Sequence, residues 1–211
     1  YTTLFRSAIK RTIGKTLEDS FSLLSGITAP ETLAEYKKEY VKEADTYMTV
    51  NTFFFPETVT VLKTLKSQGA QIGIISTKFR FRIREMVDQH FPKDFFDIII
   101  GGEDVKQAKP DPQGIKKALR RLHRQKNETL YIGDSTVDAE TAQAAKVDFV
   151  GVLNGMTTRE ELIVYPHRQI LDNLSLLPLI HKFTPYEPDK HFPEKFFYSS
   201  YFPQKIVAFY K

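Results

Sequence analysis

Residues 129–138 read TLYIGDSTVD, and this stretch decides how the rest of the chain is interpreted. An apolar run from Leu130 to Ile132 stops at Gly133-Asp134, and a second carboxylate, Asp138, follows four residues later. A short continuous apolar run that ends in turn-forming residues is typical of a buried strand. The next residues, DAETAQAAK, indicate a helix, so we expect a strand that leads directly into a helix.

Outward from this stretch, strand-like and helix-like segments alternate between residues 55 and 181. The predicted strands lie within QIGIIST, FFDIIIGG, TLYIGD, DFVGVLNG and QILDNLSLLPLI, with helical patterns between them. These strands are apolar throughout, without the polar alternation of a half-exposed sheet. That pattern indicates a parallel sheet covered by helices on both faces. We therefore predict an α/β fold with a Rossmann-like parallel sheet.

Residues 8–54 have a helical pattern and are expected to form a small helical unit. One helix is predicted over AIKRTIGKTLEDSFSLLSG, with an apolar stripe formed by Ile9, Ile13, Leu17, Phe21 and Leu24. A second is predicted over PETLAEYKKEYVKEADTYM, with Leu33, Tyr36, Tyr40 and Ala44 on one face. Stripes at this spacing are usually buried in a core, so they predict no cofactor site.

The two ends of the chain have a different character. Residues 1–7, YTTLFRS, match the translation of a common sequencing adapter, so we expect an artefact there and exclude these residues from fold reasoning. Residues 182–211 are rich in Phe, Tyr and Pro without a clear period. KIVAFYK within them could form an edge strand. A docked extension, an interaction segment and out-of-frame translation are the alternatives for this tail.

Composition excludes several classes of function. The chain has 211 residues, no cysteine and a net charge of +4. The absence of cysteine excludes disulfides, thiolate metal sites and a cysteine nucleophile. Basic residues are scattered rather than clustered, which argues against nucleic acid as a partner. No apolar run reaches the roughly 20 residues of a membrane span. We expect a cytoplasmic protein that uses no membrane, although the natural N-terminus is not visible.

Polar residues follow three of the predicted segments, where an open parallel sheet binds its ligands. Ser76 and Thr77 end one strand, Lys109 precedes the stiff segment Pro-Asp-Pro, and Asp134 ends another strand. Each has a structural alternative. Ser76 could cap the next helix, Lys109 could be a solvated surface group, and Asp134 with Asp138 could cap a helix start. For Asp111 the capping role is the favoured interpretation.

Taken together, IIST, KPDP and GDSTVD resemble the second, third and fourth motifs of the haloacid dehalogenase superfamily, in its phosphoglycolate phosphatase-like branch. The resemblance extends from about Ala8 to Ile180, and the helical unit is similar to the small α-helical cap of that superfamily. It implies a Mg²⁺-dependent phosphatase of small phosphorylated metabolites that acts through an aspartyl-phosphate.

The resemblance also implies a role for each candidate residue. Ser76 and Lys109 would be catalytic. Both would bind the phosphoryl group, together with the backbone N–H of Thr77, which stands where most relatives have Asn. Asp134 would be a magnesium ligand, and Asp138 a further ligand or a support behind it. These roles suit the charge of a phosphoryl group, which must be screened before a carboxylate can attack it.

The first motif of the superfamily, Asp-x-Asp-Gly-Thr, supplies the nucleophile, and no Asp-x-Asp occurs in this chain. We therefore expect a fragment that is inactive. In the superfamily the strand with this motif lies between the strands that carry Ser76 and Asp134. We predict that these two strands flank a slot, or that a foreign segment such as KIVAFY fills it. A pyrophosphatase, a sugar-phosphate mutase and a non-catalytic phosphate- or partner-binding relative are the alternative functions.

Overall fold

The structure is a computed structural model that describes residues 7–12, 14–47, 52–179 and 206–209. Its helices are α2 (Leu17–Ser25), α3 (Pro30–Tyr47), α4 (Thr58–Ser67), α5 (Arg80–Val87), α6 (Gln113–Leu122), α7 (Thr136–Ala145) and α8 (Arg159–Leu162). Short 3-10 turns are η1 (Gly102–Asp104), η2 (Lys126–Glu128) and η3 (Leu174–Leu179). Within the described ranges, no helix is both long and apolar enough to cross a membrane.

Six strands form one sheet in the order β2-β1-β6-β3-β4-β5. They are β1 (Gln71–Ile75), β2 (Ile98–Ile100), β3 (Thr129–Gly133), β4 (Asp148–Val152), β5 (Gln169–Leu171) and β6 (Ile206–Phe209). β1 pairs with β2 in parallel, and β3, β4 and β5 form a second parallel set. The predicted parallel α/β fold is confirmed, with each of the five predicted strands in its expected segment.

Side chains of the parallel strands alternate between two buried faces. Leu130 and Ile132 of β3 face a cluster that includes residues of α4, α5 and η3. Tyr131, between them, faces a second cluster with α6 and α7. A strand that is buried on both faces needs apolar residues at every position, which explains the uninterrupted apolar runs in the sequence.

β6 lies in the middle of the sheet and runs antiparallel to both of its neighbours. Its Ala208 is level with Ile72 of β1 on one side and Leu130 of β3 on the other. The prediction that a segment such as KIVAFY fills the slot between these strands is confirmed. The prediction of an edge strand is wrong, because both edges of β6 are paired.

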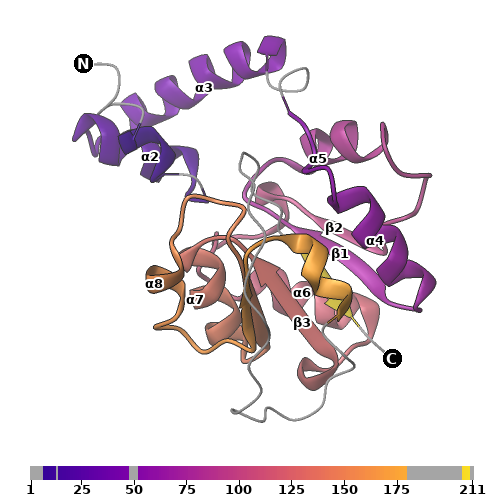
Figure 1. The fold of residues 1–211 in the computed structure, drawn as a ribbon. Coiled ribbons are helices and arrows are strands. Elements are labelled where there is room, and N and C mark those ends of the chain that lie inside the picture. The colour runs from indigo at the N-terminus through magenta and orange to yellow at the C-terminus, as the bar shows by residue number, and fades with distance from the viewer. Residues whose placement is uncertain (1–6, 13, 48–51, 180–205, 210–211) are drawn as a thin grey trace.

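The helices α2 and α3 lie side by side, apart from the sheet (Figure 1). The single helix predicted over residues 8–26 is interrupted. A helical turn precedes Gly14, which has a φ of 99°, and α2 begins only after Thr16, whose side chain accepts a hydrogen bond from the backbone N–H of Asp19. A positive φ is unfavourable for residues other than glycine, and a threonine cap starts a new helix, so the helix breaks between them.

The apolar stripes of this helical pair are less buried than predicted. Leu33 is buried, but Tyr36 and Tyr40 are 39% and 40% exposed, and no residue of α2 is fully buried. Phe21 of α2 contacts Tyr36 and Tyr40 edge to face, with ring centroids 6.0 and 5.8 Å apart. The helical pair is therefore joined by these aromatic contacts and by the ion pair between Lys37 and Glu18, and few of its side chains are fully buried.

Candidate functional site

The sheet brings Ser76 and Asp134 to the same rim. Ile74 of β1 and Ile132 of β3 are level with one another through Ile206 of β6. Ser76 and Asp134 each follow two residues later, so they lie level at the carboxyl ends of their strands. One strand position separates them, which corresponds to about 9–10 Å between their backbones. This rim is where an open α/β sheet binds its ligands.

Lys109 reaches this rim from the loop before α6 and forms a buried ion pair. Its Nζ lies 2.8 Å from Oδ1 of Asp138, and the two side chains are 4% and 0% exposed. Lysine and aspartate are almost never buried to this extent unless they are paired. The interpretation of Lys109 as a solvated surface group is therefore wrong.

Asp138 is surrounded by hydrogen-bond donors. Its Oδ1 also accepts from the hydroxyl of Tyr131 at 3.2 Å, and its Oδ2 accepts from the hydroxyl of Ser135 at 2.5 Å. Ser135 also caps α7, because its Oγ accepts from the backbone N–H of Asp138. Burial, and then the negative charge of Asp138, raise the pKa of Tyr131 well above its ordinary value, so this hydroxyl remains a donor.

Asp134 is 3% exposed and lies against the loop that follows β4. A Cβ on Gly155 of that loop would lie 2.3 Å from Oδ2 of Asp134, so only glycine lets the backbone approach so closely. Neither Gly155 nor Tyr131 is among the residues predicted from sequence. Tyr131 lies within an apolar run, so the sequence predicts a buried strand residue and not a hydrogen-bond donor. The sequence around Gly155 predicts only a loop after a strand.

Ser76 takes part in a tight turn rather than in a helix cap. Its Oγ accepts from the backbone N–H of Lys78 at 3.1 Å, whereas the N-cap of α5 is Phe79. The carbonyl of Lys78 accepts from the backbone N–H of Gly102, which joins this turn to the loop after β2. Ser76 is thereby fixed at the rim with its hydroxyl hydrogen still able to donate.

Asp111 has the structural role that the sequence favours. Its Oδ1 accepts from the backbone N–H of Gln113 at 2.8 Å, at the first residue of α6. The helix begins one residue later than expected, with Pro112 as the N-cap instead of the first helical residue. Asp111 therefore supports the loop that carries Lys109 and takes no part in the rim.

The carboxylates at the rim do not by themselves make a magnesium site. Both oxygens of Asp138 accept hydrogen bonds, and the donors are Lys109, Tyr131 and Ser135. Among the residues that the structure describes, no group of three or more His, Asp or Glu side chains could hold a metal ion. Mg²⁺ keeps several waters and is usually bound through one or two carboxylates together with substrate phosphate, so these side chains would supply only part of its ligation.

A large cavity opens from the rim toward the helical pair. Its volume is about 930 Å³, and it is bounded by α2 and α3 on one side and by the end of β1 and α5 on the other. Ser76, Thr77 and Lys78 contribute to its wall, and Lys109, Asp134 and Asp138 do not. The rim therefore has two parts, an open part at Ser76 and a buried ionic part behind it.

The sequence matches the family model of haloacid dehalogenase-like hydrolases over residues 1–152. The chain belongs to this family. A solved haloacid dehalogenase-like hydrolase of Bacteroides fragilis is 56% identical, with a TM-score of 0.82 over 84% of each chain. The resemblance read from the three motifs is confirmed at the level of the family.

Two further proteins are similar to this chain. The pyrophosphatase PpaX of Bacillus mycoides is 32% identical over 176 residues, which cover 80% of this chain and 77% of that protein. A predicted phosphoglycolate phosphatase of Haemophilus somnus has a TM-score of 0.73 at 16% identity, over 82% of this chain and 81% of that one, and so shares the fold. Both matches agree with the family membership of the chain and with its fold.

Proposed function

We propose that this chain carries the phosphoryl-binding part of a phosphatase that acts on small phosphorylated metabolites, similar to phosphoglycolate phosphatase. The observation that carries the proposal is the buried pair of Lys109 and Asp138, 2.8 Å apart behind the rim. An unpaired buried ammonium destabilises a fold, and the carboxylate of Asp138 offsets the desolvation penalty of Lys109. A fixed cation at the carboxyl end of a parallel sheet suits an anionic ligand.

Within this proposal each rim residue has a definite task. Lys109 is held by Asp138, and its positive charge would attract the phosphoryl group. The hydroxyl of Ser76 and the backbone N–H of Thr77 bind phosphoryl oxygens at the open part of the rim. Asp138 holds Lys109 in place, which makes it a positioning residue, and the metal ligand proposed in this chain is Asp134.

We further propose that the chain does not hydrolyse phosphate esters by itself. The family reaction needs an aspartate nucleophile from Asp-x-Asp-Gly-Thr, and this sequence contains no Asp-x-Asp. The strand position between Ser76 and Asp134 is taken by β6, whose amino end points to the rim. Magnesium would supply charge neutralisation together with that missing motif.

The proposal is tested by adding a segment with an Asp-x-Asp-Gly-Thr strand ahead of Ala8 and removing residues 205–211. Hydrolysis of p-nitrophenyl phosphate is measured with and without Mg²⁺. We expect activity in the extended protein that depends on Mg²⁺ and on the first aspartate of the added motif. An extended protein that folds, yet is no more active than its Asp134→Asn variant, would overturn the proposal.

A second candidate is a pyrophosphatase, because the curated relatives at 30–32% identity bear that name. The extended protein separates the two candidates directly. A phosphatase of organic monoesters releases phosphate from p-nitrophenyl phosphate faster than from pyrophosphate at equal concentration, and a pyrophosphatase shows the reverse order.

A further inference from the structure

The cavity between the helical pair and the end of β1 has a lining that suits an anion with an apolar body. Its wall is mainly apolar, and four basic and two acidic side chains border it. The acidic groups are engaged already. Glu18 accepts from Lys37 at 2.6 Å, and Glu103 accepts from the backbone N–H of Arg80 at 2.9 Å. By formal count the lining keeps a small net positive charge, although Lys37 and Arg82 are themselves paired with Glu18 and Glu85.

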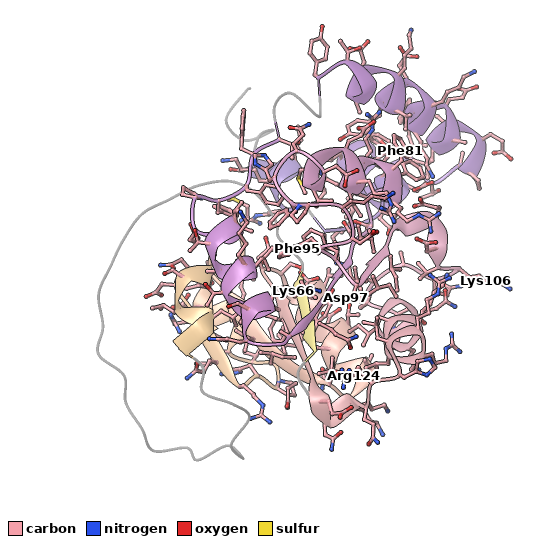
Figure 2. All side chains as sticks on the ribbon, turned by 90° about the vertical axis from the view of Figure 1, so that its right-hand side faces the viewer. Lys66, Phe81, Phe95, Asp97, Lys106 and Arg124 are labelled. Atoms are coloured by element: carbon pink, nitrogen blue, oxygen red, sulfur yellow. The ribbon has the colours of Figure 1, made fainter. Side chains whose placement is uncertain are left out.

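Aromatic rings form much of the wall and remain partly exposed. Phe79 and Phe81 stack with their centroids 5.9 Å apart, and Phe81 is 48% exposed on the side of the sheet domain that faces the helical pair (Figure 2). Across the cavity, Phe21 of α2 lies against two tyrosines of α3. Contiguous exposed apolar surface of this kind marks a binding site more often than an ordinary surface.

The volume also argues for a bulky ligand. About 930 Å³ is near the upper end of the range of roughly 300–1,000 Å³ that pockets for drug-sized molecules occupy. Pyrophosphate or phosphoglycolate would leave nearly all of this apolar wall in water. An aromatic ring system would cover it and could pack against Phe21 and Phe79 in the offset or edge-on arrangements that such rings prefer.

We propose that the cavity binds the organic part of an aryl phosphate, a phosphate monoester of an aromatic alcohol, with its phosphoryl group at Ser76 and Thr77. This inference rests on the proposed function, since it takes the same rim as the phosphoryl site. The inference goes beyond the proposed function because it assigns a class of substrate. Phe21 and Phe79 would provide the preference for that class.

The test is calorimetric titration of the full chain with 1-naphthyl phosphate, inorganic phosphate and 1-naphthol. We expect 1-naphthyl phosphate to bind at least about tenfold more tightly than inorganic phosphate, because burial of the naphthyl rings contributes more than about 1.4 kcal/mol to the free energy of binding. It should also bind at least about tenfold more tightly than 1-naphthol, because 1-naphthol lacks the phosphoryl group. Affinity for 1-naphthyl phosphate no higher than for inorganic phosphate would overturn the inference. Equal binding of 1-naphthol would also overturn it, because the phosphoryl group would then contribute nothing.

Variants on the two walls identify the cavity as the place of binding. Phe21→Ala and Phe79→Leu should each remove most of the aryl preference and leave the affinity for inorganic phosphate unchanged. Leu23→Ala is the matched control on α2, because Leu23 is 65% exposed and does not line the cavity. Phe79→Leu keeps an apolar side chain, so it remains informative if Phe21→Ala unfolds the helical pair. An undiminished preference in both variants contradicts the inference.

The outcome is separable from that of the proposed function. Hydrolysis by the extended protein without any aryl preference in binding would overturn only the inference. Aryl-selective binding by the present chain, without hydrolysis in the extended protein, would overturn only the proposed phosphatase function.

Discussion

At the scale of single residues, the site depends on one buried ion pair and the groups that hold it. Asp138 accepts hydrogen bonds from Lys109, Tyr131 and Ser135, so its negative charge is compensated although it is fully buried. The sequence indicates that Asp134 and Asp138 lie about one helical turn apart. It does not indicate that a lysine 29 residues upstream faces Asp138. The role of Asp138 as a further magnesium ligand or a support behind Asp134 stays a prediction.

Lys109→Met should destabilise the protein strongly, because it leaves Asp138 buried and uncompensated. Breaking a buried pair on one side costs about 3–5 kcal/mol, which urea unfolding would detect. Lys42→Met is the control, since Lys42 and its partner Glu39 have side chains 72% and 67% exposed and such pairs contribute about 0–1 kcal/mol. Lys109→Met combined with Asp138→Asn should recover most of the loss. Equal effects of the two single variants would contradict a buried charge at Asp138.

At the scale of elements, the junctions between strands and helices fix the rim. β3 passes into α7 within two residues, and this requires Gly133 to lie close against Asp138. Strands and helices of the sheet domain follow from the apolar runs and turn residues of the sequence. The break before α2 was missed, because the apolar spacing continues across Gly14 although the backbone turns there.

Gly133→Ala should cost more stability than the same change at the neighbouring Gly151. A Cβ at residue 133 would lie 2.3 Å from the Cβ of Asp138, whereas at residue 151 its nearest neighbour is a methyl of Leu162 at 3.0 Å. The two glycines are level in adjacent strands, so their backbones are comparable. We expect a loss of about 1–3 kcal/mol at residue 133 and less than about 1 kcal/mol at residue 151 in thermal unfolding. The reverse order would show that the β3–α7 junction is not tight.

At the scale of the whole molecule, the otherwise parallel sheet is completed by the antiparallel strand β6. β1 and β3 point the same way, and β6 joins them by running against both. The sequence predicted a slot here only because the three motifs resemble a family with a further strand at that position. Without that resemblance, the apolar segment KIVAFYK indicates only that an edge strand could form. A short apolar segment near a chain end carries no information about which strands it pairs with.

Ala208→Pro should disrupt this central pairing. Proline lacks the N–H that an inner strand donates and is confined to edges and bulges in sheets, so β1 and β3 would lose their shared partner. We expect faster hydrogen exchange in β1 and β3, and aggregation detected by light scattering, since exposed inner edges pair with other chains. Ala208→Gly keeps the N–H and adds no side-chain bulk, so it should disturb the pairing much less than proline does. An unchanged exchange pattern in the proline variant would place β6 outside the sheet.

The central claim, that the rim of this chain binds a phosphoryl group through Lys109, is tested most directly by titration with inorganic phosphate. The comparison is between the parent and the variant with both Lys109→Met and Asp138→Asn, which removes the cation without leaving a buried charge. We predict measurable binding by the parent and at least a tenfold loss in the variant, a change of about 1.4 kcal/mol, with little change in melting temperature. Equal affinity of the two proteins would contradict the account.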